Sequence, residues 1–522
     1  MENLRRRDLE GLSKNLNFIT RSDLACPNLA CLNVGMTESK NSLRTFLYII
    51  AGVFLLVFAK NWEPGIGVSS TTYGALAKNI LSTGNLFHFN LGPGLYDPFV
   101  DHPPLALWLD ALAFKLFGIS AQTIRLVSSI AGILAIAAMF GAVKNLTNER
   151  HAVFTYLIII PVTTFFNFMA SGWLDMPMVA FTLGGFYFAT LAERKNRSLN
   201  VFLAGLCLSC AVLTKGAGAL GTIPVGLFIL IYNFKSPKAL ASFAVGIVAP
   251  LSLFTFLHYQ QEGFIFWSAY LKRQFGQNVV QQSAHEPFWY FRATWERAAI
   301  LLLLFPFAIR KLWKDQRPLC ILVLGQLLIH IAVYSTSARH YDQYTLPIYP
   351  WLAITAGYLL ATKFANANPI KISKVLAGIA LFFFVAVDLL PIRVHSGNEV
   401  PFRAFMPAMG SFSKVQEMYF PSTIEDQDMW EITGSFISWY LDKTPVGVEP
   451  SKFKETLRQH PEVLAIVETK TFNELSFKKE DGDIHHKCLW NEELILLATE
   501  EQCPSSVQSY RPIETKTQTF TR

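Results

Sequence analysis

Long apolar runs alternate with short polar connections over most of the chain. A helix needs about 20 apolar residues to cross a bilayer, with a range of roughly 17–25. The pattern predicts about eleven membrane-spanning helices, near residues 43–60, 123–143, 151–170, 176–193, 199–214, 218–233, 238–257, 297–310, 318–335, 344–362 and 373–391.

One apolar segment does not fit this series. Residues 103–118 (PPLALWLDALAFKLFG) are short and contain Asp110 and Lys115. Counting them as a span would invert every later connection, so the segment is predicted to be an amphipathic helix at the membrane surface. Residues 61–122 then form one large loop on the extracytoplasmic side.

The composition agrees with a membrane protein. Of the 522 residues, 52% are hydrophobic and 16% are charged, whereas a soluble domain carries about 25% charged residues. The net charge is +7, but the basic residues cluster in the connections between apolar runs, so no nucleic-acid partner is expected. No cleavable signal peptide is evident before Leu43, and Met36 is an alternative start.

The basic connections predict the orientation, because cytoplasmic connections are enriched in Lys and Arg. Arg5, Arg6 and Arg7 place residues 1–42 in the cytoplasm as an N-terminal tail. The later connections on the same side are then all basic: 144–150, 193–197, 235–238, 310–317 and 363–374. Residues 43–391 form the transmembrane domain and residues 392–522 an extracytoplasmic C-terminal domain.

The C-terminal domain has the pattern of a small α/β fold. Residues 462–467 (EVLAIV) and 494–498 (LILLA) are typical of strands, and residues 450–459 are typical of a helix. Cys488 and Cys503 can pair if this domain lies in an oxidising compartment. The sequence leaves that pairing open.

Polar residues with chemical potential gather in the extracytoplasmic connections. Residues at span ends are often interfacial anchors, so each alone is weak evidence. Their predicted convergence on one membrane face points to a site, and they are Asp101, His102, Asp175, Lys215, His285, Glu286, Arg339, His340, Tyr341 and Asp342.

Each of these residues also has an ordinary structural explanation. Asp175 can cap the next helix or face a polar cavity, and Lys215 can snorkel or bind a phosphate. Asp101 and His102 can cap the surface helix, or bind a metal or a phosphate. Arg339 is either an anchor or a phosphate ligand. The aromatic run around Trp289, which follows His285 and Glu286, fits an aromatic belt or a sugar platform.

Motifs along the chain resemble those of polyprenyl-phosphate-sugar-dependent glycosyltransferases of the GT-C fold, the group that includes protein O-mannosyltransferases and the lipid A aminoarabinose transferase. The resemblance covers about residues 43–365. It is carried by Tyr73–Ile80 (YGALAKNI), His102–Leu105 (HPPL), Trp108, Leu116–Gly118, Arg125, Asp175, Leu213–Gly216 (LTKG), His285–Pro287 (HEP) and Tyr344–Pro350 (YTLPIYP).

The resemblance implies transfer of a sugar from a polyprenyl-phosphate donor to an extracytoplasmic lipid, glycan or protein, in modification of a cell envelope such as lipopolysaccharide. It also implies an integral protein of the bacterial inner membrane, in contact with membrane lipids. No cofactor is required, and a divalent metal is compatible with His102 and His285.

The same resemblance implies roles for individual residues. Asp101, Asp175 and Glu63 are candidates for the catalytic base or for acceptor orientation. The donor phosphate is expected to bind Lys215, Arg339, His102 and Tyr344. His285, Glu286 and Trp289 are expected to form a platform for the acceptor or the sugar.

The chain departs from the family at one position. Members carry an acidic residue three or four positions before the tyrosine that matches Tyr73, and Ser69 and Ser70 stand there in this chain. Another carboxylate then acts as base, or the chain is an inactive relative that binds lipid or scaffolds partners. A transporter is a further alternative, but it would place charges inside the spans, and few are found there.

Overall fold

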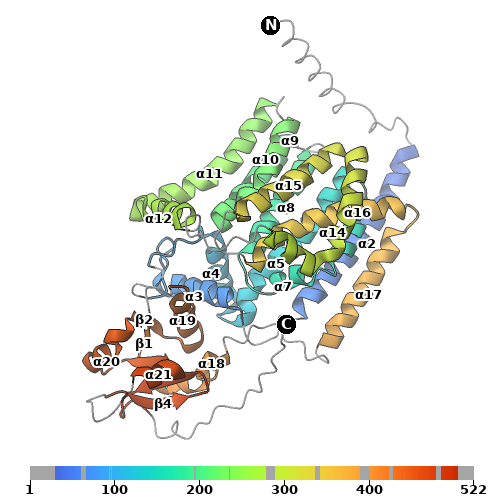
Figure 1. The fold of residues 1–522 in the computed structure, drawn as a ribbon. Coiled ribbons are helices and arrows are strands. Elements are labelled where there is room, and N and C mark those ends of the chain that lie inside the picture. Colours follow the sequence, from blue (N-terminus) through green and yellow to red (C-terminus); the bar gives the residue numbers. More distant parts are fainter. Residues whose placement is uncertain are drawn as a thin grey trace.

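The computed structural model describes residues 30–59, 66–92, 95, 97–192, 196–233, 236–277, 288–335, 341–387, 400–422, 427–475, 477 and 484–503. A bundle of long helices forms the larger part, and a small sheet domain lies at one end of it (Figure 1). The end that carries the sheet domain is called the site face below.

The bundle is built from the apolar runs that the sequence predicts to span the membrane. Its helices are α2 (Ala30–Phe58), α5 (Ala121–Leu146), α6 (Glu149–Ile159), α7 (Thr163–Met169), α8 (Asp175–Ala192), α9 (Arg197–Lys215), α10 (Ile223–Asn233), α11 (Pro237–Glu262), α14 (Trp289–Asp315), α15 (Arg317–Ser335), α16 (Tyr349–Lys363) and α17 (Pro369–Val387).

The predicted count of eleven spans is not confirmed. Within the described ranges, six helices are long and apolar enough to cross a membrane, or up to seven if a bent pair is one span. That pair is α6 and α7, which meet at 88° and divide the predicted run 151–170. The protein is nevertheless an integral membrane protein. Its first described helix, α2, begins at Ala30, before the start of the first predicted span at Leu43.

Small residues allow the central helices to approach closely. Gly205 of α9 and Gly246 of α11 face each other, and a Cβ on either would collide with backbone atoms of the other helix. Such glycine contacts are typical of helix pairs in lipid. The α9–α11 and α8–α9 contacts hold the bundle around the ends of α8 and α9.

Shorter helices cover the site face. They are α3 (Val68–Thr83), α4 (Leu105–Phe117), α12 (Ile265–Leu271), the π-helical turn η2 (Lys272–Gln277) and the 3₁₀ turns η1 (Gly216–Thr222) and η3 (Asp342–Ile348). The predicted surface helix within 103–118 forms as α4 and is not among the candidate spans. Leu112, Leu116 and Phe117 on α4 are exposed, as expected for a helix that lies against lipid.

The C-terminal domain is a five-stranded mixed sheet with the order β2-β1-β3-β5-β4. The strands β2, β1 and β3 are parallel, whereas β5 is antiparallel to both of its neighbours, β3 and β4. The predicted strands and helix form as β3, β5 and α20, so the small α/β fold is confirmed. Its elements are α18 (Val400–Arg403), η4 (Met406–Phe412), β1 (Glu417–Pro421), α19 (Gln427–Phe436), η6 (Ile437–Leu441), β2 (Thr444–Val448), α20 (Pro450–Gln459), β3 (Leu464–Glu468), α21 (Thr469–Leu475), β4 (His486–Trp490) and β5 (Leu494–Ala498).

The sheet domain contacts the bundle through α3. The hydroxyls of Thr72 and Ser435 form a buried hydrogen bond of 2.8 Å, and Lys78 forms an ion pair with Asp442. Gly74 lies against the indole ring of Trp439, which occupies the space that a side chain at position 74 would need. The α3 helix therefore connects the sheet domain to the site face.

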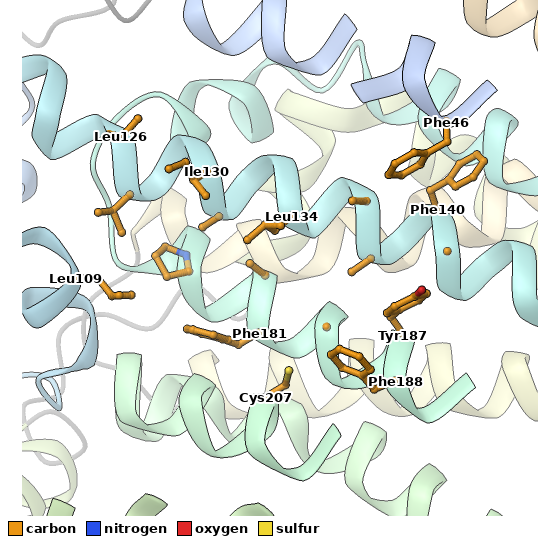
Figure 2. A pocket seen from close by; sticks show the side chains of 18 of the residues that line it. Phe46, Leu109, Leu126, Ile130, Leu134, Phe140, Phe181, Tyr187, Phe188 and Cys207 are labelled. Carbon is orange, nitrogen blue, oxygen red and sulfur yellow. The ribbon is translucent and has the colours of Figure 1, made fainter. Parts of the chain in front are cut away.

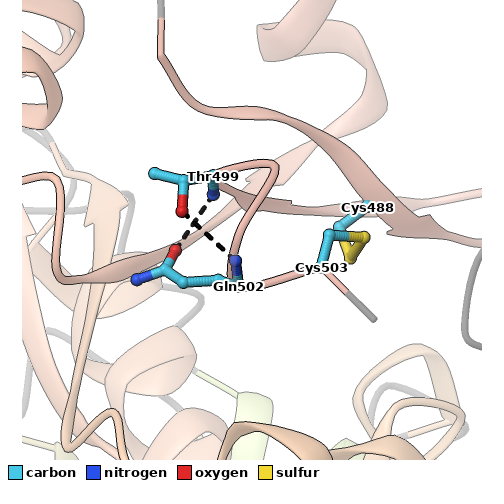
Figure 3. Close-up of a disulfide and its surroundings, with 4 residues drawn as sticks. All are labelled: Cys488, Thr499, Gln502 and Cys503. Carbon is cyan, nitrogen blue, oxygen red and sulfur yellow. Dashed lines mark hydrogen bonds between the residues drawn. A yellow bond between two sulfur atoms is a disulfide. The ribbon is translucent and has the colours of Figure 1, made fainter. Parts of the chain in front are cut away.

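The structure pairs Cys488 of β4 with Cys503, with their Cα atoms 5.7 Å apart (Figure 3). The hydrogen bonds between Thr499 and Gln502 close the turn that brings Cys503 back to β4. The disulfide closes a loop of 15 residues, next to the edge strand of the sheet.

Removal of this disulfide is expected to destabilise the sheet domain by about 3 kcal/mol, because the closed 15-residue loop restricts the unfolded chain. The full-length Cys503→Ser variant should melt at a lower temperature than the wild type without reductant. Reductant should lower the melting temperature of the wild type but not that of the variant. Equal melting of the two oxidised proteins would contradict the stabilising role.

Candidate functional site

Four polar residues predicted from the sequence meet where helices of the bundle reach the site face. Asp175 is the first residue of α8 and Lys215 is the last residue of α9. Because α8 and α9 are antiparallel neighbours, these two ends meet. Asp101 and His102 precede the two prolines that lead into α4.

Asp175 and Lys215 form a buried ion pair, with side-chain exposures of 1% and 5%. The Nζ atom of Lys215 also lies 5.4 Å from the ring centre of Tyr344 in η3, as in a cation–π contact. Lys215 therefore does not snorkel to the surface, and Asp175 does more than cap α8. A buried ammonium in this setting is a fixed positive charge.

Asp101 is held by a residue that the sequence does not single out. Arg273 of η2 forms an ion pair with Asp101, and its Nη2 atom lies 3.2 Å from Oδ2. The Nε2 amide of Gln274 donates to the backbone oxygen of Asp101 at 3.0 Å. The loop before α4 is thereby fixed to the segment that follows α12.

His102 lies beside Asp101 between aromatic rings. Its ring centre is 6.0 Å from that of Tyr73 and 6.3 Å from that of Phe99. Burial lowers the pKa of His102 to about 3, and the positive charges of Lys215 and Arg273 add to the effect. His102 is therefore neutral at physiological pH and can offer a phosphate a hydrogen bond but no positive charge.

Several predicted site residues cannot be placed in this way. Glu63, His285, Glu286, Arg339 and His340 lie outside the described residues.

Three other predicted residues have a defined place. Trp289 begins α14, where its ring meets that of Tyr290 edge-on at 4.9 Å. Tyr341 packs edge-on against Tyr344 at 5.6 Å, and Asp342 forms an ion pair with Arg297 of α14. Tyr341 thus lies next to a site residue, whereas Asp342 fixes η3 to α14.

Sequence reasoning misses three more residues at this site. Arg273 holds Asp101, Tyr270 accepts a hydrogen bond from the backbone N–H of Ala217, and Tyr334 stacks on Tyr344. Tyr73 belongs to the YGALAKNI motif but has no predicted role. That motif is the sequence signal that could have assigned Tyr73 to the site.

Known proteins resemble this chain in sequence and in fold. The sequence model of the dolichyl-phosphate-mannose-protein mannosyltransferase family matches residues 101–257, which contain Asp101, His102, Asp175 and Lys215. The crystal structure of ArnT from Cupriavidus metallidurans bound to undecaprenyl phosphate superposes with a TM-score of 0.68 at 13% identity, over 89% of this chain and 99% of that one. The chain has the GT-C fold.

The chain is also similar to other proteins by sequence. The chain is 24% identical over 377 residues to the undecaprenyl phosphate-alpha-4-amino-4-deoxy-L-arabinose arabinosyl transferase of Shewanella sediminis, covering 68% of this chain and 66% of that protein. An uncharacterised protein of Aquifex aeolicus is 24% identical over 378 residues, with 68% of this chain and 70% of that protein covered. The resemblance to GT-C glycosyltransferases seen in the motifs is thus confirmed.

An apolar groove of about 980 Å³ lies along the bundle next to α4 and α8. It runs along α5 between α2 and α8, with Leu126, Ile130 and Leu134 of α5 on its wall (Figure 2). Leu109 of α4 and Pro177 of α8 line it as well, and Pro177 follows Asp175 by two residues. The groove wall thus includes the first turn of α8, the helix that begins at Asp175.

The predicted compatibility of His102 with a divalent ion concerns a possible metal site. In the part of the chain with described positions, no group of three or more His, Cys, Asp or Glu side chains is arranged to hold a metal. His285 lies outside that part.

A second polar cluster joins the loop before the site to the end of α11. The imidazole of His88 lies 2.6 Å from a carboxylate oxygen of Asp97 and 2.6 Å from one of Glu262. His258 approaches the other oxygen of Glu262 at 3.6 Å. Partial burial alone would lower the pKa of His88, but the hydrogen bonds to Asp97 and Glu262 outweigh it and raise the pKa.

This cluster is expected to make stability depend on pH. The folded-state pKa of His88 is raised. Its contribution to the free energy of unfolding is therefore complete below the ordinary histidine pKa of about 6.5, and it is lost as the pH rises through the folded-state pKa. The wild type should therefore have a higher melting temperature than His88→Gln, and the difference should shrink as the pH rises above about 6.5. Melting curves of both full-length proteins test this, and a margin independent of pH would contradict it.

Proposed function

We propose that the protein is a membrane glycosyltransferase that moves a sugar from a polyprenyl-phosphate donor to an extracytoplasmic acceptor. The observation that carries the proposal is the buried Lys215–Asp175 pair beside Tyr344, with Asp101 and Arg273 at the same site. Positive groups and carboxylates in a shielded site suit a reaction in which a phosphate leaves and a hydroxyl loses its proton.

The donor phosphate would bind between the two cationic groups. An ammonium has three N–H donors, and Lys215 can keep its contact with Asp175 while it donates to a phosphate oxygen. The guanidinium of Arg273 matches phosphate oxygens in a fork geometry. Both charges would stabilise the phosphate as the bond to the sugar breaks, through an oxocarbenium-like transition state.

Asp101 is the candidate for the base. In the structure its carboxylate is paired with Arg273. A donor phosphate would compete for the guanidinium and leave an Asp101 oxygen able to accept the proton of the acceptor hydroxyl. Asp175 fits this role less well, because it is buried against Lys215. Its proposed role is to orient Lys215.

The groove supports a lipid-linked donor. An isoprenoid chain needs an apolar path that begins near the phosphate. Pro177 on the groove wall lies on α8, two residues after Asp175, and Leu109 lies on α4, which follows Asp101 and His102. The proposed location is the bacterial inner membrane, with residues 1–42 in the cytoplasm and the sheet domain outside. The acceptor is a lipid, glycan or protein of the cell envelope.

Mass spectrometry of extracted glycolipids, polyprenyl phosphates and envelope glycoproteins, from cells with and without the gene, tests the proposal. We expect one sugar mass to vanish from an acceptor while a polyprenyl-phosphate sugar accumulates. The wild-type gene should restore the acceptor, and the Lys215→Met gene should not. If neither carrier nor acceptor changes, the transferase function is wrong and an inactive binding role becomes the better explanation.

A further inference from the structure

The turn η1 follows Lys215 directly and is held on two sides by side chains that the sequence does not connect with it. Gly216 has a φ of +55°, a left-handed conformation that favours glycine. A Cβ at this position would overlap the hydroxyl of Tyr270. The neighbouring N–H of Ala217 donates to that hydroxyl, so α12 fixes the start of the turn.

Helix α15 holds the other side of η1. Gln326, His330 and Tyr334 are spaced by four residues and share one face of α15. The Nδ1 atom of His330 lies 2.7 Å from the backbone oxygen of Gln326 and therefore carries the proton. The rest of the imidazole fills the space that a side chain at Gly221 would need.

Tyr334 contacts the surroundings of Lys215 twice. Its hydroxyl donates to the backbone oxygen of Gly218 at 3.2 Å. Its ring stacks on that of Tyr344, with centres 4.6 Å apart and planes inclined by 16°. Tyr344 is the ring beside the Lys215 ammonium. One side chain therefore fixes both the turn after Lys215 and the aromatic surface next to it.

The backbone of Tyr334 is itself held in place. The hydroxyl of Tyr290 on α14 donates to the Tyr334 carbonyl oxygen at 2.8 Å. Tyr334 lies at the end of α15, where an unpaired carbonyl is the normal condition of a helix. The bond from α14 satisfies that carbonyl and limits the movement of the ring.

We propose that Tyr334 is a positioning residue, whose contacts with Gly218 and Tyr344 hold Lys215 in place for the donor phosphate. The imidazole of His330 supports the same turn by packing against Gly221. This inference rests on the proposed function, because it assumes that Lys215 binds the phosphate. It adds a residue within the predicted span 318–335 to a site whose predicted members, apart from Tyr344, lie in the connections.

Binding of undecaprenyl phosphate to the purified full-length protein tests the inference. Tyr334→Phe keeps the ring stack and loses the bond to Gly218, so its Kd should rise about fivefold. Tyr334→Leu also loses the stack, and its Kd should rise about 30-fold or more. In transfer assays the KM of the donor should rise in parallel, and the KM of the acceptor should not.

Tyr358→Phe is the matched control. Tyr358 is also buried and donates one hydrogen bond, to Asp315 at 3.2 Å, near the far end of the bundle. Its loss should leave the Kd unchanged. If Tyr334→Phe and Tyr358→Phe both bind like the wild type, the positioning role is wrong. If the wild type does not bind undecaprenyl phosphate at all, the result contradicts the proposed function itself, on which the positioning role rests.

A second pair of variants covers the case in which Tyr334→Phe does not fold. In Gly221→Ala the new Cβ meets the imidazole of His330 and should shift η1 and weaken binding. Adding His330→Ala should relieve the collision and recover part of the affinity. Wild-type affinity in Gly221→Ala alone, or no recovery in the double variant, would overturn the inference.

Discussion

Replacement of Lys215 by methionine is expected to lower sugar transfer by at least about 100-fold, the usual cost of losing one group that stabilises developing negative charge. The same change leaves the Asp175 carboxylate buried without its partner. Breaking a buried ion pair on one side costs about 3–5 kcal/mol, so the amount of folded protein should also fall. Transfer assays and melting curves of the full-length variant measure the two effects.

A double variant separates the two effects. Asp175→Leu combined with Lys215→Met replaces the ion pair by apolar side chains, which is often neutral for stability. It should recover folding and remain inactive. Lys78→Met is the matched control, because its ion pair with Asp442 is exposed and such pairs contribute about 0–1 kcal/mol. Recovery of transfer in the double variant would show that the pair is only structural.

The second large effect is expected for Asp101→Asn, which should lower kcat by about 10²–10⁴-fold by removing the base. The change keeps the shape of the side chain, and the bond from Gln274 goes to the backbone oxygen. The variant loses the ion pair with Arg273, whose two side chains are about a quarter exposed. The loop should keep its place through Gln274, and the melting temperature should fall only slightly, because partly exposed pairs contribute little. Single-turnover assays with saturating donor would measure the chemical step.

Two further variants test the choice of Asp101. Asp97→Asn removes a carboxylate from the same loop, at the His88 cluster, and should leave kcat near the wild-type value. Ser69→Asp restores an acid at the position where family members carry one. If Ser69→Asp raises activity and Asp101→Asn leaves it unchanged, Asp101 is not the base.

The sequence predicted four of the residues that the structure brings together at the site. Asp101, Asp175, Lys215 and Tyr344 each lie at the end of an apolar run or in a connection on the same predicted side. Topology alone brings such positions to one face. The pairing of Asp175 with Lys215 needed the structure, because charge patterns place a residue on a face without choosing its partner.

The residues that hold the site were not predictable from the same pattern. Arg273 lies in a long connection, and no local signal shows that α12 and η2 bring it back to Asp101. Tyr334 lies near a span end, where an aromatic residue is ordinarily interpreted as an interfacial anchor. Both contacts depend on packing between elements distant in the sequence.

Packing that the sequence pattern does not show also contributes to the difference between the predicted and the observed number of spans. Hydropathy recognises the apolar run 151–170 but does not detect the bend that divides it into α6 and α7. In the sheet domain the short continuous apolar runs were enough, because β3 and β5 are buried along almost their whole length.

The contact between Gly74 and Trp439 limits how this protein can change over evolution or in engineered chimaeras. The indole fills the space next to Gly74, and the adjacent residue Tyr73 is beside His102. A larger residue at 74 would be tolerated only with a smaller one at 439. Exchanging the sheet domain between relatives therefore requires a matching α3, and the two positions should covary among homologues.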